Sequence, residues 1–209
     1  MIKEVVFRHT NVDYLYRLHT AKLNKIVNFM QLKSYLNNIK ENCPNNFFES
    51  GPRSSMLKFK LGIRLHCIKG HEVSDLTKKA IKLNGKSHQS IQSFMLENDD
   101  KTIACEIPIW LNNNEISSFK RLFNSNLPLT GHIDLLRIED NKIWVWDYKP
   151  KATEQLYAST QVYFYALMLS KRTSIPLNNF RCGYFDKDYA FLFMPEESAI
   201  TTNKTLNDF

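Results

Sequence analysis

The sequence lacks the features of a membrane or exported protein. No window approaches the roughly 18 uninterrupted apolar residues that a membrane-spanning helix needs. The N-terminal residues carry charges where a secretory signal would have an apolar segment, so no export signal is visible. We therefore expect a soluble protein that stays in the cytoplasm or an equivalent compartment.

Paired cysteines are also missing. The four cysteines lie far apart and form no C-x-x-C pair, which argues against a zinc knuckle and, in a reducing compartment, against disulfides. We interpret them as buried thiols, at Cys43, Cys67, Cys105 and Cys182. The chain has no internal repeat and no low-complexity segment.

The size and composition fit one globular domain. With 209 residues, of which 43% are hydrophobic, the chain is long enough to bury a single substantial core. We expect a helical N-terminal extension over residues 1–52, the core of the domain over 53–194 and a polar tail over 195–209.

Positive charge is concentrated in one segment. The formal net charge is +7, and residues 53–86 hold nine lysines and arginines against two acids, which equals the surplus of the whole chain. Such clustering creates a local positive field that attracts polyanions, nucleic acid first. A solvated basic face would give the same pattern.

Apolar spacing predicts helices in the first half of the chain and mainly strands in the second. The expected helices cover 12–24, 27–41, about 54–68, 72–83, 87–97 and 153–171; the expected strands cover 102–110, 130–139, 142–149, 180–186 and 189–194. Asp140-Asn141 is a hairpin signal between two of the strands. Together they predict an α/β fold with a central mixed sheet flanked by helices.

Two of the predicted strands bring acids together. If a short turn at Asp140-Asn141 makes 130–139 and 142–149 antiparallel neighbours, Asp134 lies opposite Asp147. Adjacent carboxylates repel, and a proton, another cation or a divalent metal must offset the repulsion. Oxygen ligands without a cysteine or histidine pair favour Mg²⁺ or Mn²⁺.

Lys149 lies two residues beyond Asp147 and adds a base to this group. An ammonium beside a metal site can orient a water molecule and balance charge on a phosphate under attack, which indicates a phosphodiester hydrolase. A plain Asp147–Lys149 ion pair at the end of a sheet is the alternative. Glu106 lies mid-strand in an apolar setting and is a further candidate acid, although an edge position facing solvent would also accommodate it.

Four short motifs in this chain resemble the PD-(D/E)xK nuclease superfamily, and within it the RecB-like exonuclease branch. They are G-I-R-L-H (62–66), G-H-I-D (131–134), D-Y-K (147–149) and Q-V-Y-F-Y (161–165). The resemblance spans about residues 55–194. It implies a restriction-endonuclease-like core, in which all four motifs occur in this order.

The resemblance also implies roles for individual residues. Asp134 and Asp147 would be catalytic acids that bind Mg²⁺ or Mn²⁺, with the Tyr148 carbonyl and His66 as further ligands, and Lys149 would be the catalytic lysine. Two helix residues one turn apart and three basic residues would contact DNA or steady the site: Gln161, Tyr165, Lys60, Arg64 and Lys69.

The sequence departs from the family pattern in two places. Pro150 follows the lysine where the family often has Thr or a small residue. Members of the branch that hold an iron–sulfur cluster have three late cysteines, whereas only Cys182 is late here, so we expect no cluster.

The combined interpretation is a metal-dependent DNase, an exonuclease acting on single-stranded DNA or DNA ends in repair, recombination or replication. It would work in the cytoplasm or another DNA-containing compartment, without a membrane. The alternatives are a non-catalytic nucleic-acid-binding module of the same fold and a repair- or restriction-type endonuclease. The concentrated positive charge disfavours a small-molecule metallohydrolase.

Overall fold

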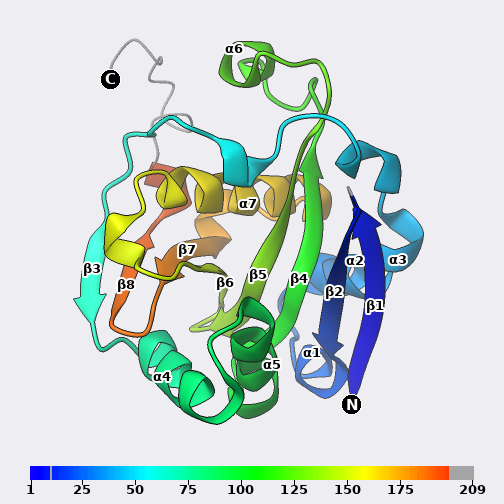
Figure 1. Cartoon of the computed structure of the whole chain (residues 1–209). Coiled ribbons are helices and arrows are strands. Elements are labelled where there is room, and N and C mark those ends of the chain that lie inside the picture. Colours follow the sequence, from blue (N-terminus) through cyan, green and yellow to red (C-terminus); the bar gives the residue numbers. More distant parts are fainter. Residues whose placement is uncertain (10, 198–209) are drawn as a thin grey trace.

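The structure, a computed structural model, describes residues 1–9 and 11–197. Its centre is an eight-stranded mixed sheet in the order β1-β2-β4-β5-β6-β7-β8-β3 (Figure 1). All described neighbouring strands are antiparallel except β6 and β7, which are parallel and joined through α7. The strands are β1 Ile2–His9, β2 Val12–His19, β3 His66–Lys69, β4 Thr102–Leu111, β5 Leu129–Glu139, β6 Lys142–Tyr148, β7 Phe180–Phe185 and β8 Tyr189–Phe193.

Helices cover both faces of this sheet. The larger hydrophobic cluster packs α7 and α2 against one face, and a second cluster packs α4 and α5 against the other. The helices are α1 Thr20–Asn24, α2 Met30–Asn37, α3 Ile39–Asn42, α4 Glu72–Asn84, α5 His88–Asn98, α6 Phe119–Phe123 and α7 Ala158–Thr173. The predicted α/β fold with a mixed, helix-flanked sheet is therefore confirmed.

The second half of the chain follows the predicted elements closely. The strands expected from residue 102 onward form β4 to β8, and the expected helix 153–171 forms as α7. The predicted hairpin turn has left-handed backbone at both Asp140 (φ 49°) and Asn141 (φ 55°). Two such residues match the right-handed twist of the flanking strands and fix their register.

The predicted helix over 12–24 is wrong for most of its length. Residues 12–19 form β2, which pairs with β1 in a hairpin, and only Thr20–Asn24 is helical. Tyr16 and Leu18 are fully buried and two residues apart, so the strand period of two prevailed over the apparent helical spacing. The expected helical N-terminal part is thus a β-hairpin followed by α1 to α3.

The predicted helix over 54–68 is also wrong. The segment has one 3-10 turn, Ser54–Met56, then an extended stretch, and ends in the edge strand β3. Part of its backbone bonds to α7: Leu61 N donates to Thr160 Oγ1 at 3.3 Å, and Thr160 Oγ1 donates to the Phe59 carbonyl at 2.9 Å. The segment buries apolar side chains against α7 in an extended conformation, so it does not form the predicted amphipathic helix.

Three smaller expectations have mixed outcomes. Cys67 is exposed on β3, whereas the other three cysteines are buried as expected. Most of the predicted polar tail, residues 198–209, lies outside the described residues. Within the described part of the chain, no helix is long and apolar enough to cross a membrane.

Candidate active site

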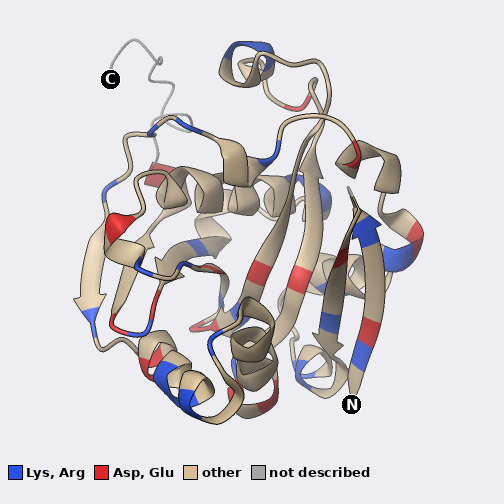
Figure 2. Cartoon of the chain, viewed as in Figure 1, with Lys and Arg blue, Asp and Glu red and all other residues tan. Residues whose placement is uncertain are grey.

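Three acids lie side by side on three adjacent strands. The β4–β5 register pairs Cys105 with Leu135 and Ile107 with Ile133, which sets Glu106 opposite Asp134. The β5–β6 register pairs Leu135 with Trp146, and its continuation sets Asp134 opposite Asp147. Figure 2 shows acidic positions on the neighbouring strands β4 and β5 near the middle of the sheet.

Glu106 has a strained backbone. Its φ of 52° is left-handed, which is unusual for a residue without glycine's freedom in the interior of a strand. Cys105 and Ile107, on either side of it, belong to different hydrophobic clusters, so the alternation of side chains reverses here. Gln92 on α5 donates to Glu106 Oε1 at 2.6 Å and holds the carboxylate. Strain of this kind clusters at functional sites.

Burial raises the pKa of all three carboxyl groups, and neighbouring acids add to the shift for Asp134 and Glu106. Burial raises the pKa of Asp134 well above its usual value, and Asp147 and Glu106 add to this shift. Burial likewise raises the pKa of Glu106, with a further contribution from Asp147. Burial also raises the pKa of Asp147, although Lys149 opposes the change. The site thus concentrates negative charge that a nearby cation would stabilise.

Lys149 supplies one positive charge at this point. Its Nζ lies 2.7 Å from Asp147 Oδ2, and its side chain is 21% exposed, so it faces both the acids and the solvent. Burial disfavours the ammonium, but Asp147 and Asp134 outweigh burial and raise the pKa of Lys149. The lysine therefore stays protonated beside the acids. This contact is the one expected of an ion pair and of a catalytic lysine alike.

Backbone and helix groups orient the two aspartates. The Tyr148 N–H donates to Asp134 Oδ2 at 2.8 Å. Gln161 on α7 points its Nε2 towards Asp147 Oδ1, at 3.4 Å, and towards Tyr165 Oη, at 2.6 Å. Gln161 and Tyr165 are both buried beside the acids, and Tyr165 also bonds to Ser54.

Gly131 permits the close approach of α7 to the strand that carries Asp134. A Cβ atom at this position would lie 2.4 Å from Ser54 Oγ and 2.5 Å from a ring carbon of Tyr165. Ser54 donates to the Thr130 carbonyl at 3.1 Å, so it is fixed from the other side. The glycine of the G-H-I-D motif thus makes room for the tyrosine of the Q-V-Y-F-Y motif.

His88, which the sequence reasoning missed, lies next to these groups. Its Nε2 is 3.1 Å from the Tyr148 carbonyl oxygen, and burial lowers its pKa, against the opposing effect of Asp147. The sequence indicates the position of this histidine in its helix, although not its neighbours. Gly85 ends one predicted helix, Ser87 caps the next, and a histidine directly after such a cap lies at the exposed start of a helix.

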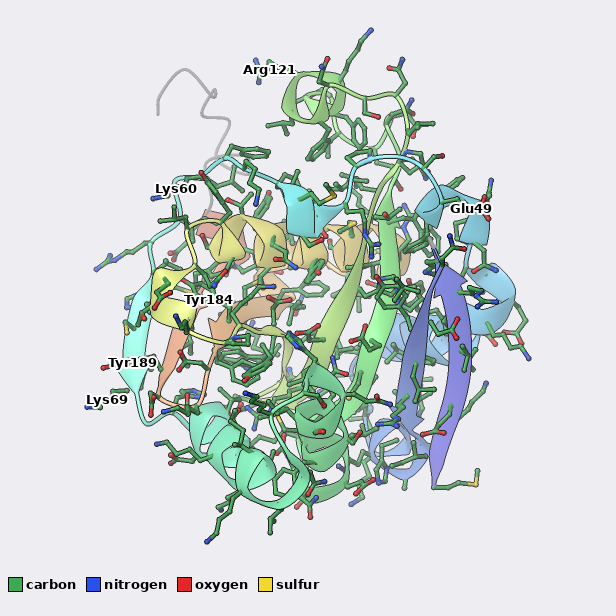
Figure 3. The ribbon with its side chains drawn as sticks, in the orientation of Figure 1. Glu49, Lys60, Lys69, Arg121, Tyr184 and Tyr189 are labelled. Carbon is green, nitrogen blue, oxygen red and sulfur yellow. The ribbon has the colours of Figure 1, made fainter. Side chains whose placement is uncertain are left out.

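His66 is not brought together with the acids. It lies on the edge strand β3, which is separated from β6 by β7 and β8, so about 14 Å of sheet lies between them at the usual strand spacing. Lys60, Arg64 and Lys69 are exposed on or near the same edge, and Figure 3 shows Lys60 and Lys69 on that outer side. The family-like spacing Gly62-x3-His66 thus occurs on an element other than the expected one.

The donors at the site suit a hard divalent cation by their chemistry. Three buried carboxyl groups with raised pKa values, the Tyr148 carbonyl and a neutral imidazole are ligand types that Mg²⁺ or Mn²⁺ accepts. As they stand, however, no three His, Cys, Asp or Glu side chains of the described residues converge on one point. Asp134 is turned to the Tyr148 N–H and Asp147 to Lys149, so a cation would draw the carboxylates away from these partners.

Comparison with known families agrees with the fold. The family model of the PD-(D/E)XK nuclease superfamily matches residues 72–203, which is more than half of the chain. The chain therefore belongs to the PD-(D/E)XK nuclease superfamily, whose members typically use divalent metals. The matched region contains His88 and the three acids with Lys149, whereas His66 lies outside it. Neither the curated proteins nor the solved structures gave a match.

Proposed function

We propose that this protein is a Mg²⁺- or Mn²⁺-dependent deoxyribonuclease of the RecB-like branch, an exonuclease that acts on single-stranded DNA or DNA ends. The observation that carries the proposal is the row Glu106, Asp134 and Asp147 on three adjacent strands with the Lys149 ammonium 2.7 Å from the last acid. A buried acid cluster of this kind is costly for the fold and is best explained by chemistry that uses it.

The acids would hold the cation, and Lys149 would act on the substrate. A bound divalent cation supplies a Lewis acid for the phosphate and lowers the pKa of a water molecule. Lys149 would orient the attacking water and balance charge that develops on the phosphate. Gln161 and Gln92 would keep Asp147 and Glu106 in position, because each donates its amide towards one of these carboxylates.

His88 supports the RecB-like branch, for which the sequence resemblance implies an additional histidine ligand. The His88 Nε2–H donates to the Tyr148 carbonyl oxygen at 3.1 Å, so the two ligand atoms lie side by side, and a bound cation would replace this hydrogen bond. The lowered pKa of His88 favours the neutral ring that metal binding requires. We propose His88, in place of His66, as this ligand.

A cavity beside Glu106 would let a DNA strand reach the acids. A cavity of about 220 Å³ lies between β2 and α5, and Tyr14, Arg17, His88 and Gln92 are among the residues that line it. Tyr14, whose ring also stacks on His132, is an aromatic group, and Arg17, which pairs with Glu4 at 2.9 Å, carries a positive charge; these are the two kinds of group that hold single-stranded DNA. Repair, recombination or replication would supply such strands.

Lys149→Ala tests the proposed function. We expect wild-type protein to degrade labelled single-stranded DNA with Mg²⁺ or Mn²⁺ and not with EDTA, and the variant to lose about 100-fold or more in kcat, because it lacks the charge beside the phosphate. Lys40→Ala, which removes an exposed lysine of α3, is the matched control.

Two outcomes would contradict the proposal. If Lys149→Ala degraded DNA as fast as Lys40→Ala, the assigned site would be wrong. If wild-type protein shifted DNA in a gel but left it intact with every metal, the chain would be a binding module. Closed circular DNA should persist; its linearisation would identify an endonuclease instead.

A further inference from the structure

A small polar cavity adjoins Lys149 on the side of α7. It has a volume of about 110 Å³, and its lining includes Ser55, Lys58, Lys149, Gln161 and the first residue of α7, Ala158. The segment that contributes Ser55 and Lys58 is the one expected to be helical. Because it is extended and packs on α7, it brings Lys58 to the start of that helix.

The cavity is electropositive. Among the described residues that line it there are two lysines and no acid. Its lining includes the start of the 16-residue helix α7, at Tyr157 and Ala158, and the Tyr157 side chain at the N-cap makes no capping hydrogen bond. The first N–H groups of a helix lack partners within the helix and carry partial positive charge. Lysine ammonium groups and such N–H groups together bind anions.

The size of the cavity further restricts the kind of ligand that it can hold. Pockets for small molecules usually measure about 300–1,000 Å³, so about 110 Å³ is too small for a nucleoside. The volume suits a single compact group. A tetrahedral phosphate group has this size, carries the complementary charge and recurs along the proposed substrate.

Lys58 is positioned for such a group without being held by an acid. Its Nζ lies 5.7 Å from the centre of the Tyr157 ring, a cation–π contact that keeps the exposed side chain over the cavity. Asp147, which pairs with Lys149, lies on the sheet side and is not part of the lining. Lys149 thus borders both the acid row and the cavity.

We propose that this cavity binds a phosphate of the substrate other than the one that is cleaved, with Lys58 and the first turn of α7 as its main contacts. The inference rests on the proposed function, since it places the substrate strand across Lys149 with one phosphate at the acids and a neighbouring one in the cavity. The phosphate is either an internal phosphodiester or the terminal phosphate of a strand end.

The test measures binding without cleavage. Wild-type protein, Lys58→Ala, Lys58→Glu and the control Lys40→Ala are compared by fluorescence anisotropy in EDTA across a salt series. The ligands are single-stranded DNA with a 5′-phosphate, a 3′-phosphate or hydroxyl ends. Lys58 is exposed, and circular dichroism confirms that each variant is folded.

We expect both Lys58 variants to weaken binding, and the slope of log K against log salt to become about 0.7 shallower for single-stranded DNA, as the loss of one phosphate contact requires. An equal loss for all ligands identifies an internal phosphodiester, and a loss confined to one phosphorylated end identifies a terminal phosphate. In cleavage assays, KM should rise roughly fivefold while kcat changes by less than about twofold.

Unchanged affinity and salt slope in both Lys58 variants, relative to Lys40→Ala, would overturn the proposal even if wild-type protein cleaves DNA. Should wild-type protein not cleave DNA, titration with inorganic phosphate still tests the cavity. Amide signals of residues 158–160 should shift in wild-type protein and not in Lys58→Glu, and the absence of any shift in wild-type protein would refute the site.

Discussion

At the scale of single residues, the acid row opposes the stability of the fold. Asp134 is 8% exposed, faces two further carboxyl groups, and has a pKa raised by burial and by these neighbours. Glu106 adds a left-handed backbone within a strand, a conformation that costs on the order of 1–3 kcal/mol. Such costs persist where a site needs its groups in one arrangement.

Asp134→Asn should therefore stabilise the protein while it removes a ligand. In EDTA we expect the free energy of unfolding to rise by about 1 kcal/mol, because the amide keeps an oxygen for the Tyr148 N–H and removes a repelling charge. Mn²⁺ should raise the melting temperature of wild-type protein but not of the variant. Denaturant titration and thermal melts measure both.

The exposed Asp100→Asn is the control, for which both quantities should match those of wild-type protein. An equal Mn²⁺ response in Asp134→Asn, with calorimetry giving the same affinity, would remove Asp134 from the ligand set.

At the scale of elements, helix α5 serves the site with one face. His88 and Gln92 are four residues apart and so lie on the same side, one at the Tyr148 carbonyl and the other at Glu106. The helix in turn is fixed to the sheet where it ends. Asp99, directly after α5, accepts from Arg137 Nε of β5 at 2.9 Å, and Arg137 Nη2 donates to Glu72 of α4 at 2.9 Å.

Arg137→Met should destabilise the protein strongly. Arg137 is fully buried, and its loss leaves the buried Asp99 carboxylate without its main counter-charge, which costs about 3–5 kcal/mol. Lys101→Met is the matched control: this lysine pairs with the same Glu72 but is 36% exposed, so about 1 kcal/mol or less is expected. Urea denaturation compares the two, and equal losses would mean that the network does not support α4 and α5.

The sequence predicted the elements whose periodicity and turn signals agree. The hairpin β5–β6 is one case, because Asp140-Asn141 fixed its register and thereby the pairing of Asp134 with Asp147. The segment 54–68 is the opposite case. Its leucines have helical spacing, yet Leu57 and Leu61 are buried in the cluster that includes α7 while Leu65 is exposed, an outcome of contacts far away in the sequence that no local pattern encodes.

Tertiary packing also explains why the sequence pointed to His66 as the histidine of the site and not to His88. His66 has the family-like spacing after a glycine, but the side that a strand or helix presents to the site depends on tertiary packing. His88 was within a correctly predicted helix, and its role becomes visible only when α5 is placed beside Tyr148.

At the scale of the whole molecule, two histidines add to the β2–β4 pairing that binds the N-terminal hairpin to the core. His9 of β1 and His132 of β5 are buried, with His9 Nδ1 3.0 Å from His132 Nε2. His132 also stacks on Tyr14 of β2, with 3.7 Å between ring centres. Burial lowers the pKa of both histidines; Arg53 lowers them further, and for His9 Asn45 and Glu49 act in the opposite direction.

This pair should make the protein sensitive to acid. Unfolded histidine has a pKa of about 6.5, so both folded rings stay neutral where unfolded ones take up protons. The stabilisation is present above about pH 6.5 and is lost as the pH falls through the lower folded pKa values, by up to about 1.4 kcal/mol per pH unit for each ring.

Denaturant titrations between pH 8 and 5 measure this loss, and His132→Phe should make it shallower. An identical pH slope in the variant would show that His132 titrates alike in both states.

The two-residue turn at Asp140-Asn141 has an effect well beyond its own surroundings. Glu139 and Lys142, which flank it, are each five residues from the aspartates, so the turn lies about 17 Å from the acids at the usual rise of a strand. One inserted residue would shift the pairing by one position and turn Asp147 to the opposite face from Asp134. The length of a solvent-exposed loop is therefore a condition for the proposed hydrolysis, and a natural variant with a longer loop here would keep every residue of the motif but no longer place the two aspartates together.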